Sequence, residues 1–313
     1  MRSNLLCLSG IAFIFKPRFQ LFVSCRLPNR FKKFVVCFIG RGMVGIFLIT
    51  LIFFWNSLFG FCGNNKTAWV QQRNHFCLSG SYWNYSSDHF WNANGNQRDA
   101  FNKFTKEEYV LYLEYGLTQR DTLWLKDGWA RIRESVNGRT LGFADMEIGW
   151  KRYLGQKWGA AISGEIVGII PIESEHKPGL RYGRYGGEFN LLLSKEFSYW
   201  KLPGWYDFRL GYRAYEGFPS DQIRADAAAT FNLFPCVKLL LAGHLEYGLF
   251  NGHSIMNQSF FCLFSNYRLL KGQVELLFSL YKEASLFVGY QRHIWGKNVG
   301  TGGLWYGGVQ VQF

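Results

Sequence analysis

Residues 251–259, NGHSIMNQS, place a histidine beside a serine, two side-chain types used in nucleophilic hydrolysis. On a β-strand a base reaches a nucleophile when the two are two residues apart, because alternate residues share a face. His253 and Ser254 are adjacent, so a strand would point them to opposite faces, and a loop suits them better. His244 and Glu246 share a parity, but that pair contains no nucleophile. We therefore predict no catalytic residue and no enzyme activity.

The sequence also contains no motif typical of a metal site or a cofactor site. The cysteines are Cys7, Cys25, Cys37, Cys62, Cys77, Cys236 and Cys262. No two of them form a C-x-x-C pair, which disfavours a zinc site, and no glycine-rich phosphate loop is present. We predict no metal and no cofactor. Most of the cysteines are expected to behave as small hydrophobic residues. Cys62 and Cys77 could form a disulfide if both remain in the protein after cleavage of a signal segment.

Charged side chains of both signs recur at alternate positions between residues 114 and 246. On strands they would share one face, where they could line a narrow diffusion path. They could equally pair with one another across neighbouring strands, because buried charges need partners. Arg209, Arg213 and Arg224 would form a basic strip that favours anions. The pore-lining candidates are Glu114, Asp145, Glu147, Glu188, Asp207, Arg209, Arg213, Arg224, Asp226, Lys238, His244 and Glu246.

These side chains must be positioned by β-strands, since residues 109–313 alternate apolar and polar side chains with a period of two. In GWYDFRLGYRAYE (204–216), Tyr, Phe, Leu and Tyr alternate with Asp, Arg, Gly and Arg. Turn residues separate these stretches, and the connections between consecutive stretches are alternately short and long. We place two of the short turns at Pro203-Gly204 and at Lys271-Gly272. Counting from residue 109 predicts about twelve strands.

The composition favours a membrane β-barrel. Aromatic residues make up 19% of the 313 residues, with 35 Gly and only 7 Pro. The mean hydropathy of −0.08 excludes a bundle of membrane helices, whereas a barrel averages near zero because only every second residue is apolar. We therefore predict an all-β fold, a transmembrane antiparallel up-and-down barrel; a soluble sandwich is the alternative. The aromatic girdle would include Trp150, Trp158, Trp205, Tyr247 and Trp305.

The N-terminal part differs from the rest. Residues 1–66 hold nine Lys and Arg and no acid, out of a net charge of +13, and residues 43–63 are apolar. A basic region followed by an apolar core is typical of a secretory signal, with an anchor helix as the alternative. We predict residues 1–63 as this segment, of which 1–42 could lie outside the mature protein. Residues 64–105 would be a plug or a periplasmic segment, although 76–84 could add a strand. The barrel would be 106–313. The basic residues do not indicate nucleic-acid binding.

The chain ends on LWYGGVQVQF, residues 304–313, with an apolar residue at every second position. Such a strand suits the closing strand of a barrel. Trp305, Val309, Val311 and Phe313 resemble the C-terminal signal that the outer-membrane assembly machinery recognises in bacterial barrels. The resemblance implies export through the inner membrane to the outer membrane. Membrane lipids and the assembly machinery would then be partners.

Two further segments, EYGLTQRDTLWLKDG (114–128) and GFADMEIGWKRYL (142–154), resemble a recurring pattern in a family of bacterial outer-membrane transporters. That family is grouped with the phenol meta-degradation pathway, and the resemblance covers residues 105–313. It implies a porin-like channel for passive passage of a small solute, and it brings no catalytic residue. A lipid-modifying hydrolase and a structural surface barrel with a blocked lumen are the alternatives.

Overall fold

The computed structural model describes residues 5–8, 11–16, 20–24, 67–134, 138–173, 180–199, 202–252, 266–281 and 283–313. The chain divides into two units, Met1–Ser57 and Leu58–Phe313. In the first unit, β1 (Leu5–Leu8), β2 (Ile11–Lys16) and β3 (Gln20–Ser24) form an antiparallel sheet in that order. The apolar segment predicted as a signal, residues 43–63, lies outside the described residues.

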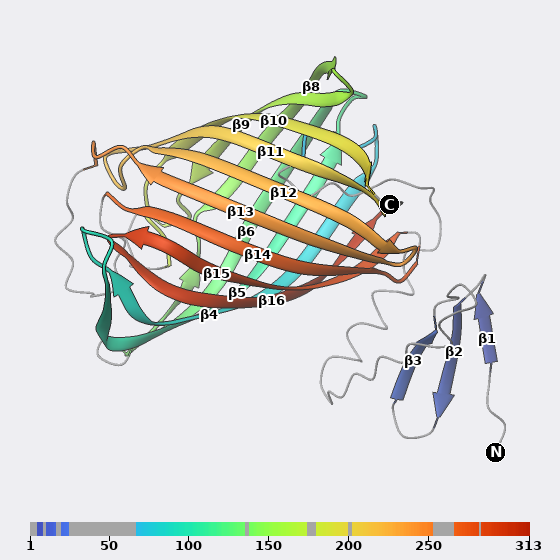
Figure 1. The fold of residues 1–313 in the computed structure, drawn as a ribbon, viewed down its shortest axis with the longest axis horizontal. Coiled ribbons are helices and arrows are strands. Elements are labelled where there is room, and N and C mark those ends of the chain that lie inside the picture. Colours follow the sequence, from blue (N-terminus) through green and yellow to red (C-terminus); the bar gives the residue numbers. More distant parts are fainter. Residues whose placement is uncertain are drawn as a thin grey trace. The chain divides into compact units, whose positions relative to one another are not determined.

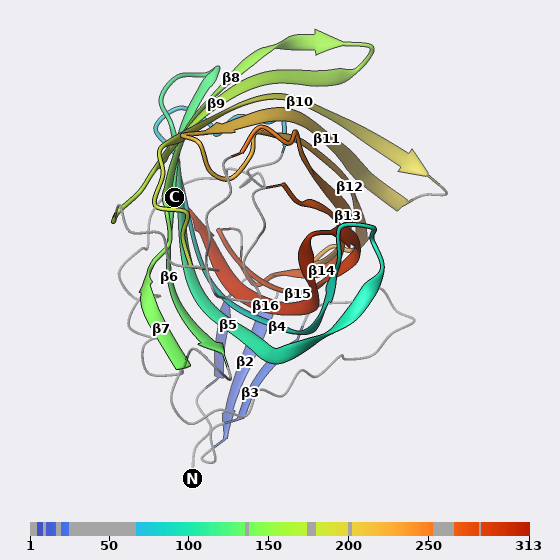
Figure 2. The ribbon, with the colours of Figure 1, turned by 90° about the vertical axis from the view of Figure 1, so that its left-hand side faces the viewer.

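The second unit is an antiparallel β-barrel that closes on itself (Figure 1). Its strands are β4 (Phe76–Trp91), β5 (Gln97–Gly116), β6 (Asp121–Glu134), β7 (Gly138–Phe143), β8 (Met146–Lys157), β9 (Ala160–Ile170), β10 (Gly186–Tyr199), β11 (Leu202–Tyr215), β12 (Gln222–Phe234), β13 (Val237–Gly248), β14 (Arg268–Ser279), β15 (Ala284–Lys297) and β16 (Val299–Gln312). The first strand, β4, pairs with both β5 and the last strand, β16, and this pairing completes the ring visible in Figure 2.

Two of these elements belong to one strand of the wall. β7 pairs with residues 129–134 of β6, and β8 pairs with residues 121–126 of the same strand. β7 and β8 are therefore consecutive parts of one wall strand, interrupted at residues 144–145. Counted in this way the barrel has 12 strands, which confirms the predicted fold class.

Three assignments from the sequence are wrong, and two of the errors cancel in the strand count. Pro203-Gly204 is not a turn, because both residues pair with β10 inside strand β11. Lys271-Gly272 is not a turn, because β14 runs through it without a break and the Lys271 side chain faces inward to Glu246. In turn, residues 76–91 form wall strand β4 rather than part of a plug or periplasmic segment, so the wall begins at Phe76. The sequence indicated an additional strand only as an alternative and only at 76–84, because serine and asparagine weaken the period-two signal of β4.

The longest connections lie at one end of the barrel, as predicted, but that end also has short ones, since β6 and β7 are linked by three residues and β15 and β16 by one. Residues 117–120, 158–159 and 235–236 make short turns at the end where Phe313 lies, which we name the turn end. At the opposite end, named the loop end, residues 171–185 and 249–267 make longer connections. Short and long connections at opposite ends are characteristic of outer-membrane barrels.

The wall places apolar side chains outside and charged side chains inside. On β11, Phe208 and Leu210 are 45% and 47% exposed, whereas Asp207 and Arg209 are 6% and 7% exposed. A water-soluble domain shows the opposite arrangement, so the outer surface suits hydrocarbon. Trp205 was assigned to the outer girdle, and that was wrong: it alternates with Tyr206 and shares the inner face with Asp207.

Candidate functional site

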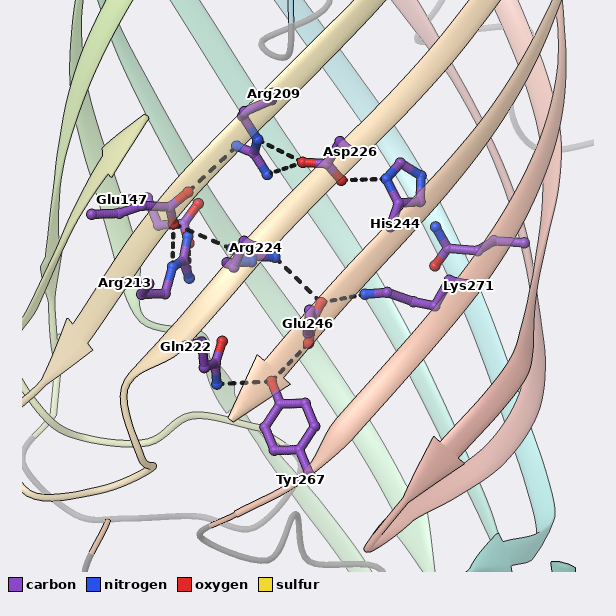
Figure 3. A network of polar contacts seen from close by, with 12 residues as sticks. Glu147, Arg209, Arg213, Gln222, Arg224, Asp226, His244, Glu246, Tyr267 and Lys271 are labelled. Atoms are coloured by element: carbon purple, nitrogen blue, oxygen red, sulfur yellow. Dashed lines mark hydrogen bonds and ion pairs between the residues drawn. The ribbon is translucent and has the colours of Figure 1, made fainter. Parts of the chain in front are cut away.

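The predicted pore-lining residues lie on the inner face of the wall, but most of them contact one another. Glu188 on β10 is the centre of the largest group, whose three arginines are labelled in Figure 3. Its carboxylate bonds to Arg213, lies 3.3 Å from an Nη atom of Arg224 and 3.6 Å from an Nη atom of Arg209. The structure thus brings together the three arginines of the predicted basic strip, around a shared carboxylate.

Each of these arginines also has a second acidic partner. Arg209 donates from Nε to Asp226 at 2.6 Å. Arg213 lies 3.0 Å from Glu147 on β8, and Arg224 lies 3.3 Å from Glu246 on β13. Glu246 in addition pairs with Lys271 on β14. We name this group the charge cluster: Glu147, Glu188, Arg209, Arg213, Arg224, Asp226, Glu246 and Lys271.

The formal charges of the charge cluster cancel, because its three arginines and one lysine face four carboxylates. Their side chains are at most 19% exposed, and charges buried to this extent are tolerated only when they are paired. The strip is therefore neutralised by its own neighbours, and it presents no excess of positive charge to the lumen.

Hydrogen bonds from further polar side chains extend the charge cluster along the inner wall. Tyr267 donates from its hydroxyl to Glu246 at 2.7 Å and accepts from Gln222 at 3.1 Å (Figure 3). His244 lies between Asp226 and Gln273, with Nε2 2.8 Å from the Gln273 amide oxygen. A chain of polar contacts thus follows the inner wall from β8 to β14.

A second polar group, the turn-end cluster, lies closer to the chain ends. Lys151 on β8 is fully buried, 3.9 Å from the carboxylate of Glu114. Glu165 on β9 accepts hydrogen bonds of 2.8 Å from both Trp124 and Asn190. Glu165 was missed as a candidate because β9 is apolar on most positions of both faces. Among the predicted residues, Asp207 accepts from Ser194, and Lys238 lies 5.1 Å from the ring of Trp205.

Asp145 has a different role from the one predicted for it. It lies at the break between β7 and β8 and accepts hydrogen bonds from the backbone of Tyr182, at 2.7 Å, and of Gly183, at 3.3 Å. Leu180 next to them packs on inward-facing Phe104 and Ile132. Residues 180–183, in the described part of the connection between β9 and β10, therefore lie against the inner wall at the loop end.

Hydrolytic geometry is not found among the contacts of the described residues. His244 contacts Asp226 and Gln273, and His293 contacts the carbonyl oxygen of Gly300 at 2.9 Å. His253 and Ser254 lie outside the described residues. Cys77 is disulfide-bonded, and Cys62, the partner suggested by the sequence, lies outside the described residues as well.

Solved outer-membrane proteins have a similar fold. An outer membrane channel from Pseudomonas putida F1 superposes with a TM-score of 0.64 at 13% identity, over 81% of this chain and 100% of that chain. The NanC porin reaches a TM-score of 0.45 at 10% identity, over 75% of this chain and 98% of that chain. At 13% identity the first likeness establishes the fold alone: this chain has the fold of an outer-membrane β-barrel.

No protein-family model and no curated protein matches this sequence. The comparisons therefore do not confirm the resemblance to the transporter family of the phenol meta-degradation pathway.

Proposed function

We propose that this chain is an outer-membrane channel through which small polar solutes diffuse passively. The contrast between the two faces of the wall carries this proposal: apolar outside, charged and hydrogen-bonding inside. A structural barrel needs only the first face, whereas a path for polar solutes needs both. Export, directed by the N-terminal segment, and assembly, directed by Trp305, Val309, Val311 and Phe313, belong to the same proposal.

A structural barrel with a blocked lumen is the second candidate, and the burial of the inner wall favours it. Lys151, Ser163 and Ser194 face inward and have no exposed surface. Side chains lining a wide aqueous channel would remain in contact with water. Over this part of the wall, residues 67 and 68 cover the inner face.

Conductance in a planar lipid bilayer separates the two candidates. The full chain would be purified in detergent, its folding checked by the shift of its gel band on heating, and single insertions recorded in KCl. Stepwise conductance is the expected result for a channel. A folded barrel that inserts without conducting would overturn the channel and leave the structural barrel.

A further inference from the structure

Four aromatic side chains form a row across the outer face of the barrel, on β4, β5, β6 and β7. Tyr82 lies opposite Tyr109, and Tyr109 lies opposite Trp129. Phe143 lies opposite Trp129 on the other side. The ring centroids of Tyr82 and Tyr109 are 5.2 Å apart, and those of Tyr109 and Trp129 are 6.0 Å apart. Aromatic side chains on the outer wall mark the boundary between hydrocarbon and headgroups, so this row places that boundary on the four strands.

The rows between this boundary and the loop end are polar and basic. Two residues nearer the loop end, the same strands carry Asn84, Glu107, Arg131 and Leu141. Two residues further on, they carry Ser86, Thr105, Arg133 and Arg139. Since alternate residues of a strand share a face, both rows lie on the outer face, at the level of the headgroups. We name Arg131, Arg133 and Arg139 the arginine patch.

The arginine patch carries more positive charge than its neighbours neutralise. Within the two rows Glu107 is the single acid; it bonds to Arg131 and lies 3.8 Å from an Nη atom of Arg133. Three positive charges against one negative charge leave a formal charge of +2. The Arg133 side chain is 56% exposed, and Arg139 is exposed as well. In contrast to the charge cluster inside the barrel, this group keeps an excess of charge that an anion can reach.

The register makes an anion between two of these arginines favourable. Arg133 on β6 and Arg139 on β7 are direct cross-strand partners on the same face. Like charges placed directly opposite each other destabilise an antiparallel pair. A phosphate group relieves this repulsion, because its oxygens accept hydrogen bonds from both guanidinium groups in the geometry that arginine offers best. The pair is therefore arranged for a phosphate.

Exposed apolar side chains adjoin the arginine patch on the side of the hydrocarbon. Leu141 and Phe143 on β7 are 41% and 45% exposed, and Trp129 on β6 is 37% exposed. A ligand that covers both parts has phosphate groups directly joined to acyl chains. The loop end carries the longest connections, which face the outside in outer-membrane barrels. In the outer leaflet of a bacterial outer membrane, lipid A combines phosphates with several acyl chains.

We propose that the arginine patch is a binding site for lipid A, the phosphorylated and acylated anchor of lipopolysaccharide. Arg133 and Arg139 hold one phosphate group between them, Arg131 adds positive charge beside it, and the apolar side chains below contact the acyl chains. This inference rests on the placement of the barrel in the outer membrane that the proposed function includes. It does not depend on conduction, so a barrel that conducts without binding lipid A would overturn this site alone.

Arg133→Gln combined with Arg139→Gln tests the site in the full-length protein. Folding in detergent is checked by the shift of the gel band on heating, and binding of bisphosphorylated lipid A is titrated by native mass spectrometry. Loss of both guanidinium groups should weaken binding about tenfold. Arg120→Gln combined with Lys157→Gln is the matched control, because it removes two exposed basic side chains at the turn end and should leave the affinity unchanged.

Equal affinities of the Arg133→Gln, Arg139→Gln variant and the unaltered protein for lipid A would overturn the proposal. Phosphatidylglycerol and inorganic phosphate serve as comparison probes in the same titration. Lipid A should bind more tightly than either, because phosphatidylglycerol offers fewer phosphates and acyl chains and inorganic phosphate offers no acyl chain. If phosphatidylglycerol bound as tightly as lipid A and lost the same factor in the variant, the assignment to lipid A would be wrong.

Arg139→Glu distinguishes a binding site from a merely structural role. The substitution replaces a like-charge pair by an ion pair with Arg133, so the temperature at which the folded gel band disappears should rise in detergent without lipid A. The affinity for lipid A should nevertheless fall by about tenfold or more. Lower stability of Arg139→Glu in lipid-free detergent would show that the two guanidinium groups do not repel each other. That result would remove the reason for an anion between them and overturn the site.

Discussion

Glu188 shows how a single carboxylate can organise the inside of a barrel wall. It contacts Arg209, Arg213 and Arg224, while its own side chain has no exposed surface. Removal of one partner from such a group leaves buried charges uncompensated. In the intact group, the attraction between the charges roughly offsets the free energy cost of removing them from water. The contribution of Glu188 to the stability of the barrel should therefore appear when Glu188 is substituted.

Glu188→Gln should destabilise the barrel by about 3–5 kcal/mol, because three guanidinium groups lose a shared charged acceptor. Unfolding in urea from lipid vesicles would measure the change. Glu107→Gln is the matched control: Glu107 pairs with Arg131 and Arg133, is 21% exposed, and should contribute no more than about 1 kcal/mol. Equal losses in the two variants would refute a special role for the charge cluster.

The sequence predicted which of these side chains face inward but not which of them meet. Parity alone places Arg209 and Asp207 on one face of a strand, since the side-chain period is two. Contacts such as that between Arg213 and Glu147 join β11 to β8, strands that do not pair with each other. Such contacts depend on the curvature and stagger of the closed wall, which no local pattern encodes.

At the scale of elements, the segment EYGLTQRD (114–121) combines two tasks. Gly116 permits the close approach of the Gln72 backbone, and the following residues build a tight turn. Thr118 Oγ1 donates to Asp121 at 2.6 Å and accepts from the backbone N–H groups of Arg120 and Asp121, each at 3.0 Å. The recurring pattern noted in the sequence is thus explained here by local structure rather than by solute recognition.

The last strand contributes to closure down to its final residue. Phe313 accepts a hydrogen bond of 2.7 Å from the N–H of Phe76 and donates one of 3.0 Å to the Phe76 carbonyl oxygen. Their rings stack with centroids 5.5 Å apart. The final phenylalanine therefore helps to join the two ends of the sheet, in addition to the assembly role proposed for it.

Deletion of Phe313 should lower both the yield of folded barrel and the temperature at which the folded gel band disappears. Two hydrogen bonds and a ring contact are lost together, each hydrogen bond contributing about 1 kcal/mol. Phe313→Leu keeps the backbone bonds and should lower the temperature less. If the deletion lowered cellular yield but left the temperature unchanged, the residue would act in assembly alone and not in closure.

Strand prediction failed where the position of a strand depends on partners that are distant along the chain. Strands with apolar outer faces, such as β11, were found from their alternation. β4 was assigned to a plug or a periplasmic segment, with 76–84 as a possible strand, because it mixes serine and asparagine with its aromatics. Its position depends on pairing with β16 at the other end of the chain. Lys271-Gly272 was taken as a turn because local composition cannot reveal that Lys271 has an acidic partner across the wall.

At the scale of the whole molecule, the lumen carries nearly balanced charge. Outside the charge cluster, the inner face carries four lysines, Lys106, Lys126, Lys151 and Lys238, and five acids, Glu108, Glu114, Glu165, Asp207 and Glu275. A balanced lining attracts neither ion strongly, because selectivity follows the net field in the path.

We expect a chloride-to-potassium permeability ratio of about 1, measured from the reversal potential in a KCl gradient. Lys126→Gln removes a side chain that is 41% exposed and should shift the ratio toward potassium. A strong preference for chloride in the unaltered protein would show that the arginines act as an unneutralised strip, as the sequence first suggested.

The pairing of β4 with β16 also determines the order of events in folding. The strands that complete the ring come from opposite ends of the barrel sequence, so their contacts have the greatest separation along the chain and are expected to form slowly. Until β16 arrives, β4 and β15 present unpaired edges that can join another chain. A product truncated before β16 would retain most of its strands and still lack closure. Premature termination should therefore yield aggregation-prone open sheets rather than smaller barrels.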